Sequence, residues 1–523
     1  MKANLVEVCG LEIGFGAGEK PVVNGVSFEI AAGECLAIVG ESGSGKSVTA
    51  RALLGLSGRG AMVGAERFLI GGHDVTRFEE SDWRQIRGGR IGLVAQDAMQ
   101  SLDPLRKIGK EVEEGVGHTP GGSSERKRLA LDALRRAGIT DALTRMGQYP
   151  HELSGGLRQR TLIASAVAAG PDLLVADEPT TALDVITQQT ILELFIEIKK
   201  SGTALLFISH DLAAISKVAD RIAVMKDGVL VEQGTAEEIL TRPCHEYTQR
   251  LLRNSIHTRR VRPRKTGDVV LSVDGVSKTY GGRVAVNDVS ITTAAGETVG
   301  VVGESGAGKS TLGRLIMGLD RPSAGSIHVD GEPWSGLSER QRRRLRRRIQ
   351  LIHQNPLAAC DPRYSVRRII AEAVGSGNAV AELLSLVGLP EAIERRRPDE
   401  ISGGQRQRVA IARALATDPD VLVCDEAVSA LDASVRGEIL ELLAEIQRIR
   451  SLGILFITHD LGVVHEICDR VHVMKDGVVV ESGWTSEVFE NPQHAYTTAL
   501  LDSVPRIEFP ATARVGGGDG AWP

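Results

Sequence analysis

The sequence GESGSGKS occupies residues Gly40–Ser47, and GESGAGKS occupies residues Gly303–Ser310. An apolar run precedes each stretch, at Cys35–Val39 and at Thr298–Val302, and a helical pattern follows it. Glycines let the backbone turn its N–H groups inward around an anion, and the positive end of the following helix points at the same place. The chain is therefore predicted to hold two phosphate-binding loops (P-loops), each between a strand and a helix. A chance glycine-rich turn is disfavoured, because the whole motif occurs twice in this context.

Each predicted P-loop carries a lysine and a serine whose chemistry suits a bound triphosphate. Lys46 can reach the β- and γ-phosphates and Ser47 can ligate Mg²⁺, and Lys309 and Ser310 repeat the pair. The loop residues predicted to contact nucleotide are Gly40, Glu41, Ser42, Gly43, Ser44, Gly45, Lys46, Ser47, Val48, Gly303, Glu304, Ser305, Gly306, Ala307, Gly308, Lys309, Ser310 and Thr311.

Length and composition restrict the class of protein. The chain has 523 residues, which suggests about three or four structural units. Hydrophobic residues make up 42%, charged residues 25%, and the net charge is −5, which is typical of a globular protein and disfavours a generally basic nucleic-acid binder. The six cysteines contain no CxxC pair, so we expect reduced core thiols in a reducing cytoplasm and no zinc ribbon. We also expect no secretory signal peptide and no membrane-spanning segment.

The remaining motifs show that the chain contains two copies of one domain, because the motifs recur in the same order. LSGGLRQR at Leu153–Arg160 returns as ISGGQRQR at Ile401–Arg408, and MKDG begins at both Met225 and Met474. The predicted divisions are a first domain at 1–254, a basic linker at 255–267, a second domain at 268–510 and a flexible tail at 511–523. Short apolar strands alternate with helical patterns in both copies, which predicts an α/β fold with a largely parallel sheet.

Acidic pairs end one apolar strand in each copy. Asp177 and Asp425 are predicted to hold Mg²⁺, and Glu178 and Glu426 are predicted to act as general bases on the attacking water. A structural carboxylate that caps the next turn is the alternative. The strands end at the sheet edge that carries the P-loops, which favours the chemical role.

A histidine and a glutamine also follow apolar strands in each copy. His210 and His459 recur at similar spacing after the acidic pairs, so a contact with the γ-phosphate is preferred over an ordinary surface histidine. Gln96 and Gln354 can touch both Mg²⁺ and the water, although each alone would be a polar residue at the end of a strand. The predicted catalytic residues are Glu178, Glu426, His210, His459, Gln96 and Gln354. The predicted metal ligands are Ser47, Gln96, Asp177, Ser310, Gln354 and Asp425.

A serine and two glycines open a helical run in each copy, at Ser154–Gly156 and at Ser402–Gly404. Serine is a good N-cap, and glycines before a helix leave free N–H groups that can bind an anion. The P-loop of the same copy already occupies the phosphate position. We therefore expect each of these turns to meet the nucleotide held by the other copy.

Together these residues resemble the nucleotide-binding domains of ABC transporters, from about Leu5 to Leu501. The resemblance implies two tandem P-loop NTPase domains, each with a RecA-like core, an antiparallel β subdomain and a helical signature subdomain. It adds a D-loop in each copy (Ala182–Asp184, Ala430–Asp432) and implies that one ATP lies between Lys46 and the signature Ser402, Gly403, Gly404 and Gln405. The other lies between Lys309 and Ser154, Gly155 and Gly156, and Phe15 and Tyr280 stack on the adenines.

A narrower similarity is to the ATPase subunits of oligopeptide, dipeptide and nickel importers, with both subunits fused in one chain. It is carried by QDAMQSLDP (Gln96–Pro104), DEPTTALDV (Asp177–Val185), QNPLAACDPR (Gln354–Arg363), HEYTQRLL (His245–Leu252) and HAYTTALL (His494–Leu501). Leu157 replaces the signature glutamine, and Ala427 replaces the proline after the second acidic pair. The cysteine cluster of some such subunits is missing, so we expect no iron–sulfur cluster.

The resemblance implies an ATP-hydrolysing importer motor at the cytoplasmic face of the cell membrane, with ATP and Mg²⁺ as cofactors. Its partners would be two permease subunits, which dock near residues 100–165 and 358–412, and indirectly a solute-binding protein. The alternative is a soluble tandem ATPase acting on ribosomes or nucleic acid, suggested by RRRLRRR at Arg342–Arg348. We expect no nucleic-acid partner, because such charge runs usually form solvated helix faces. A non-hydrolysing regulator is disfavoured, because both glutamates and both histidines are present. The transported solute is not encoded in these motifs.

Overall fold

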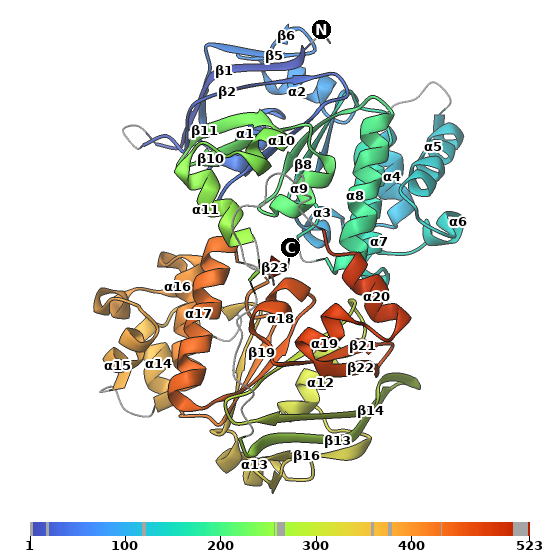
Figure 1. Cartoon of the computed structure of the whole chain (residues 1–523). Coiled ribbons are helices and arrows are strands. Elements are labelled where there is room, and N and C mark those ends of the chain that lie inside the picture. Colours follow the sequence, from blue (N-terminus) through green and yellow to red (C-terminus); the bar gives the residue numbers. More distant parts are fainter. Residues whose placement is uncertain are drawn as a thin grey trace. The chain divides into compact units, whose positions relative to one another are not determined.

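The computed structural model describes residues 4–16, 20–117, 122–181, 183–255, 257–258, 267–356, 360–374, 379–429, 431–505 and 521–522. They divide into two compact units, one built mainly from the chain up to Ser255 and the other mainly from the chain after it (Figure 1). Most of the predicted linker and tail lies outside the described residues. Within them, β12 (His257–Thr258) and β23 (Ala521–Trp522) form a short antiparallel pair.

The first unit is built on a six-stranded sheet in the order β11-β10-β3-β9-β8-β7. Neighbouring strands are parallel except for the edge strand β11, which pairs antiparallel with β10. The strands are β3 (Cys35–Val39), β7 (Ile91–Val94), β8 (Leu173–Asp177), β9 (Ala204–Ile208), β10 (Arg221–Lys226) and β11 (Val229–Thr235). In β3, Leu36 and Ile38 face one hydrophobic cluster while Cys35, Ala37 and Val39 face another. The strand is therefore buried on both faces, which explains its unbroken apolar sequence.

Helices cover both faces of this sheet, and their starts follow ordinary capping chemistry. The helices are α1 (Lys46–Ala52), α8 (Val185–Lys200), α9 (Leu212–Val218), α10 (Ala236–Thr241) and α11 (Glu246–Ser255). Asp211 caps α9 by accepting from the N–H of Ala213 at 2.9 Å, and Thr235 and Glu238 form a capping box at α10. Each cap satisfies N–H groups that a helix start leaves without partners.

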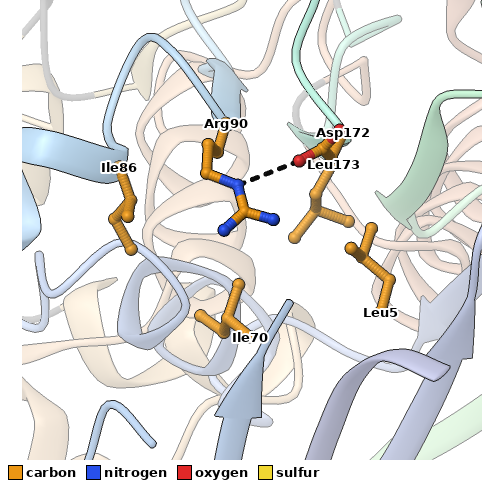
Figure 2. A pocket seen from close by; sticks show the side chains of 6 residues that line it. All are labelled: Leu5, Ile70, Ile86, Arg90, Asp172 and Leu173. Atoms are coloured by element: carbon orange, nitrogen blue, oxygen red, sulfur yellow. Dashed lines mark hydrogen bonds and ion pairs between the residues drawn. The ribbon is translucent and has the colours of Figure 1, made fainter. Parts of the chain in front are cut away.

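An antiparallel sheet packs against the core of the first unit, in the order β2-β1-β5-β6 with β4 paired to β1. Its elements are β1 (Asn4–Gly14), β2 (Val23–Ala31), β4 (Met62–Gly64), β5 (Arg67–Ile70) and β6 (His73–Asp74), followed by α2 (Glu80–Ile86). Figure 2 shows a small pocket where this sheet and α2 meet the start of β8. There the guanidinium Nε of Arg90 donates to Asp172 Oδ2 at 3.0 Å, across a lining of leucine and isoleucine side chains. This pocket lies at the amino ends of the parallel strands, away from the edge that carries the P-loop.

A helical subdomain completes the first unit. It contains α3 (Ala98–Ser101), α4 (Ile108–Val116), α5 (Gly122–Arg136), α6 (Ala142–Arg145) and α7 (Gly155–Val167). Figure 1 shows α4, α5 and α6 gathered on one side of this unit. The subdomain has its own core, in which Val112, Ala133, Leu134 and Ala164 are fully buried.

The second unit repeats this plan. Its main sheet has the order β18-β19-β20-β15-β21-β22, with β22 the antiparallel edge strand, and its smaller sheet has the order β14-β13-β16-β17. The strands are β13 (Val269–Tyr280), β14 (Arg283–Ala294), β15 (Thr298–Val302), β16 (Ala324–Val329), β17 (Glu332–Pro333), β18 (Ile349–Ile352), β19 (Val421–Asp425), β20 (Gly453–Ile457), β21 (Arg470–Lys475) and β22 (Val478–Trp484). The helices are α12 (Lys309–Ile316), α13 (Glu339–Leu345), α14 (Val366–Val374), α15 (Val380–Leu386), α16 (Gly403–Leu415), α17 (Ala433–Arg450), α18 (Leu461–Ile467), α19 (Thr485–Glu490) and α20 (Ala495–Asp502).

The predicted fold class is confirmed: both units are α/β, with a mostly parallel core sheet, an antiparallel sheet and a helical part. Within the part of the chain that the structure describes, none of the helices combines the length and the apolar character needed to cross a bilayer. All six cysteines lie among the described residues and none forms a disulfide, and burial raises the pKa of the Cys424 thiol to about 12.

Candidate nucleotide sites

The P-loop of the first unit leads from β3 into α1 and encloses the side chain of Lys46. The Lys46 ammonium is buried and donates to the carbonyl oxygens of Gly40 and Glu41, both at 2.8 Å. Gly40 has a φ of 155°, and a Cβ there would lie 2.1 Å from the carbonyl oxygen of Met225. Only glycine fits this turn. The loop therefore has the curled shape that presents N–H groups and a cation to a phosphate.

The P-loop of the second unit has the same geometry. The Lys309 ammonium donates to the carbonyl oxygens of Gly303 at 2.7 Å and Glu304 at 2.8 Å. Burial lowers the pKa of Lys309. Gly308 precedes α12 with a φ of 100°, and a Cβ there would lie 2.4 Å from the carbonyl oxygen of Ala285. The loop residues predicted to contact nucleotide thus lie together in both units.

The two aspartates that are predicted to bind magnesium are the last residues of β8 and β19. Ser47 Oγ donates to Asp177 Oδ1 at 2.8 Å, and Asp177 is only 2% exposed. Burial raises the pKa of Asp177, and burial likewise raises the pKa of Asp425. In the second unit, Asp425 Oδ1 is buried and has no hydrogen-bond partner among the described residues. A buried carboxylate oxygen without a donor is costly unless a cation reaches it, so this donor set fits Mg²⁺.

Glu178 directly follows Asp177, and its carboxylate contacts the other predicted catalytic side chains of the first unit. Gln96 Nε2 donates to Glu178 Oε2 at 3.1 Å, and His210 Nδ1 lies 3.4 Å from the same oxygen. Burial raises the pKa of Glu178, but the hydrogen bond and charge of His210, together with Lys46 and Thr181, bring it below its usual value. Glu178 is therefore ionised at neutral pH, as a general base must be.

The second unit places the same residue types together with one difference. His459 Nδ1 lies 3.2 Å from Glu426 Oε1, and this hydrogen bond lowers the pKa of Glu426. Gln354 Nε2 instead donates to Ser429 Oγ at 3.4 Å. Ser429 Oγ in turn donates to the Glu426 carbonyl oxygen at 3.0 Å. Gln354 thus reaches Glu426 through a hydroxyl, whereas Gln96 contacts the Glu178 carboxylate directly.

The signature turns begin helices, as the sequence predicts, but both glycines lie inside the first helical turn. Ser154 caps α7 and Ser402 caps α16, each by accepting a backbone N–H at the third helical position. Gln405 also accepts from the N–H of Ser402 at 3.1 Å, a contact that Leu157 cannot supply in the first unit. The D-loop alanines, Ala182 and Ala430, lie outside the described residues.

The two predicted adenine-stacking rings lie at the end of the long first strand of each unit. Phe15 directly follows β1 and is 43% exposed, and Tyr280 ends β13 and is 45% exposed. The Tyr280 hydroxyl donates to Asp320 Oδ2 at 2.7 Å, which holds the ring in place. Lys278 Nζ lies 5.0 Å from the centre of the Tyr280 ring, and both rings are partly exposed to solvent.

Sequence reasoning missed several residues that support these sites. Thr181 Oγ1 donates to Glu178 Oε2 at 3.1 Å, and Ser429 holds the corresponding place in the second unit. Gly228 donates its N–H to the carbonyl oxygen of Ser44 in the P-loop at 3.0 Å. The repeated MKDG sequence was a usable signal for this glycine. Thr181 and Ser429 are different residue types. Only their equivalent positions in the two copies could have shown that a hydroxyl is used there.

Comparisons with known proteins agree with this geometry. A model of the ABC transporter family matches residues 23–181 and 286–429, and a model of the oligopeptide/dipeptide transporter C-terminal region matches residues 231–273 and 480–519. A peptidoglycan transport ATP-binding protein of Agrobacterium fabrum is 41% identical, with 98% of each chain covered. A glutathione import ATP-binding protein of Salmonella typhimurium is 40% identical over 96% of this chain and 90% of its own.

A solved structure shows the same fold at lower identity. The archaeal ribosome recycling factor, in complex with a ribosomal stalk protein, has a TM-score of 0.63 and 20% identity, with 89% of this chain and 88% of that chain covered. At this identity the likeness concerns the fold. The family matches and the identity to the Agrobacterium and Salmonella proteins confirm the resemblance drawn from the motifs. The chain belongs to the ABC transporter family, as one of its ATP-binding proteins: an ATPase with two tandem nucleotide-binding domains.

Proposed function

We propose that this chain is the motor of an importer for peptides or a related small solute. In this proposal it works with two separate permease subunits and a solute-binding protein, at the cytoplasmic face of the cell membrane. The observation that carries the proposal is the importer C-terminal region, which matches once after each ATPase domain. The Agrobacterium and Salmonella relatives, named for peptidoglycan transport and glutathione import, support the same class of cargo.

Hydrolysis is proposed to run on the same set of side chains in each unit. Lys46 and Lys309 leave the loop carbonyls they now contact and bind the β- and γ-phosphates. Mg²⁺, held by Ser47 and Asp177 or by Ser310 and Asp425, neutralises charge on the phosphate oxygens when bound. Glu178 and Glu426 accept a proton from the attacking water.

The neighbouring residues are proposed to orient these groups and the nucleotide. His210 and His459 hold the glutamates and contact the γ-phosphate, while Gln96 and Gln354 touch the metal and the water. Phe15 and Tyr280 are proposed to stack on adenine. The signature residues, Ser154–Gly156 and Ser402–Gln405, are proposed to bind the γ-phosphate of a nucleotide.

The general-base assignment is tested by replacing both glutamates, as Glu178→Gln and Glu426→Gln. The amide keeps the shape but cannot take a proton, so ATP turnover should fall by about 100-fold or more while ATP binding remains. Glu197→Gln is a matched control, because Glu197 lies exposed on α8 in a surface pair with Lys200. Turnover within a few-fold of the unmodified chain in the double variant would exclude the two glutamates as the bases.

The importer assignment is tested by co-expression of this chain with candidate permease subunits. A stable complex in detergent, whose ATPase rate rises with solute-loaded binding protein, is the expected result. A chain that hydrolyses ATP but retains no permease would contradict the importer role and leave the ATPase intact. The alternative of a ribosomal or nucleic-acid role has no separate support, because the likeness to the recycling factor concerns the fold alone.

A further inference from the structure

The second helix after the MKDG hairpin in each unit, α11 or α20, contacts the P-loop through a buried tyrosine. The N–H of Glu41, the second residue of the first P-loop, donates to the hydroxyl of Tyr247 on α11 at 3.0 Å. In the second unit, the N–H of Glu304 donates to the hydroxyl of Tyr496 on α20, also at 3.0 Å. Tyr247 is 4% exposed and Tyr496 is 6% exposed. The contact is therefore sheltered from water and repeated in both copies.

Each tyrosine is itself held by a chain of contacts that begins on the edge strand of the core sheet. On β11, the carboxylate of Glu232 accepts from the N–H groups of Cys244 at 2.7 Å and His245 at 3.1 Å. His245 Nδ1 then accepts from the N–H of Tyr247 at 3.1 Å. This arrangement fixes the turn that enters α11 and, with it, the direction of the tyrosine ring.

The second unit repeats the chain of contacts with different neighbouring residues. The carboxylate of Glu481 on β22 accepts from the N–H groups of Gln493 at 2.8 Å and His494 at 3.1 Å. His494 Nδ1 accepts from the N–H of Tyr496 at 3.1 Å. HEYTQRLL and HAYTTALL thus share the histidine and the tyrosine that this geometry uses.

The tyrosine and Lys46 contact the same peptide unit, between Gly40 and Glu41, and Lys46 must give up its contact there to bind a phosphate. The carbonyl oxygens of Gly40 and Glu41 both accept from the Lys46 ammonium. When the ammonium turns to a phosphate, these carbonyls lose that donor, while the bond from the Glu41 N–H to Tyr247 can persist. At the far end of the loop, the N–H of Gly228 holds the carbonyl of Ser44. The tyrosine and the glycine therefore anchor the two ends of the phosphate-binding turn.

We propose that Tyr247 and Tyr496 are positioning residues that hold the entry of each P-loop in its nucleotide-binding shape. The C-terminal region of each copy thereby sets the affinity of its own domain for nucleotide. Ordering a loop before its ligand arrives lowers the entropic cost of binding. The inference rests on the proposed assignment of the P-loops as nucleotide sites, and it gives the importer C-terminal region a role within the ATPase domain.

The test replaces each tyrosine with phenylalanine, which keeps the ring and removes the hydroxyl. Binding at each site is measured separately, by removing the P-loop lysine of the other site. Tyr247→Phe is made in a chain that carries Lys309→Ala, and Tyr496→Phe is made in a chain that carries Lys46→Ala. MgADP binding is measured by calorimetry. The dissociation constant should rise by about three- to tenfold, as expected for one lost hydrogen bond. In chains with both lysines, KM for ATP should rise while kcat stays the same, because the loop shape serves ground and transition states alike.

Arg250→Ala is the matched control on the same helix. Arg250 lies over the Tyr247 ring at 5.4 Å and pairs with the Glu41 carboxylate at 3.5 Å, but it is about half exposed. An exposed pair contributes little, so this variant should change the dissociation constant less than about twofold. Ala499 stands at the equivalent place in α20. A shift from Arg250→Ala as large as that from Tyr247→Phe would show that charge, and not the hydroxyl, holds the loop.

A second variant separates loop positioning from damage to the fold. Glu232→Gln weakens the support of the α11 turn without altering Tyr247, and it should move KM for ATP in the same direction. Unchanged MgADP affinity in both phenylalanine variants, with the parent chains binding normally, would overturn the inference alone. Parent chains that bind no MgADP would contradict the nucleotide-site assignment itself. A fall in kcat with constant KM would assign the tyrosines to chemistry and would also overturn the positioning role.

Discussion

The glutamate after each aspartate that is predicted to bind magnesium has a backbone conformation that glutamate rarely adopts. Glu178 has a φ of 48° and Glu426 a φ of 49°. Such left-handed geometry costs on the order of 1–3 kcal/mol for a residue with a side chain, and it persists only where the surroundings impose it. Here the N–H of Glu178 is held by the Ile208 carbonyl at 2.9 Å, and that of Glu426 by the Ile457 carbonyl at 2.8 Å. The bend turns each carboxylate toward its histidine.

A buried histidine on β21 should make the free energy of unfolding depend on pH. His472 is 8% exposed, and neither ring nitrogen has a hydrogen-bond partner among the described residues. Burial, with the nearby charge of Arg470, lowers the pKa of His472 to about 4. The folded chain keeps the ring neutral while the unfolded chain protonates it near its ordinary pKa of 6.5. His472 therefore leaves the free energy of unfolding unchanged above about pH 6.5 and lowers it as the pH falls toward 4. The loss is about 2 kcal/mol at about pH 5.

Replacing this histidine should flatten the pH dependence. His472→Ala adopts the residue that the first copy has at the equivalent position, Ala223. Urea unfolding followed at about pH 7.5 and about pH 5 should show a smaller loss of stability in this variant than in the unmodified chain. The exposed His73→Ala is the control and should leave the pH dependence unchanged. An unaltered slope in His472→Ala would contradict a neutral buried ring.

At the scale of elements, the signature helix depends on close packing at one glycine. A Cβ on Gly156 would lie 2.5 Å from Thr187 Cγ2 on α8, and a Cβ on Gly404 would lie 2.6 Å from Val435 Cγ1 on α17. In contrast, a Cβ on the preceding residue, Gly155 or Gly403, would meet no atom within 4 Å. The second glycine therefore lets α7 approach α8 and α16 approach α17, independently of any role in binding phosphate.

Alanine substitutions at adjacent glycines should separate packing from binding. Gly156→Ala should destabilise the first unit by about 1–3 kcal/mol, because β-branched Thr187 has little room to move. Gly155→Ala should leave stability equal or slightly higher, since alanine favours a helix over glycine. Thermal unfolding of both variants, without nucleotide, measures the difference. Equal melting temperatures for the two variants would show that the helices can move apart at no cost.

At the scale of the whole molecule, duplication has produced two domains with the same set of side chains and small differences between them. The first unit has Leu157, Thr181 and Arg250 where the second has Gln405, Ser429 and Ala499. The lysine, aspartate, glutamate and histidine of each set are the same. We therefore expect both domains to bind nucleotide.

The chain should bind two molecules of MgADP. Lys46→Ala and Lys309→Ala should each leave one binding event in calorimetry, and the double variant should leave none, because each lysine supplies the buried cation of its own loop. At about 100 times the dissociation constant, nucleotide should stabilise a binding-competent unit by about 2.7 kcal/mol. Lys200→Ala, at an exposed position on α8, is the control for loss of a positive charge. Two binding events in either single variant would show that the replaced lysine is dispensable.

The bounds of the buried strands could be predicted from local runs of apolar residues. The strands Cys35–Val39 and Thr298–Val302 have the predicted bounds, because strands buried on both faces appear as unbroken apolar runs. The antiparallel strand β13 (Val269–Tyr280) is different, because polar residues such as Ser272, Asp274 and Ser277 interrupt its apolar residues. Half-exposed strands include polar residues, so hydrophobicity alone marks their ends poorly.

The sequence by itself determined the fold class, the duplication and the identity of the residues around each P-loop, because short motifs encode backbone turns and charges locally. Only the tertiary structure decided how those residues meet: that Gln96 contacts Glu178 directly while Gln354 acts through Ser429, and that Tyr247 and Tyr496 hold the loop entries. These contacts join residues up to 206 positions apart. Packing of separate elements creates them, and no local pattern of residues carries that information.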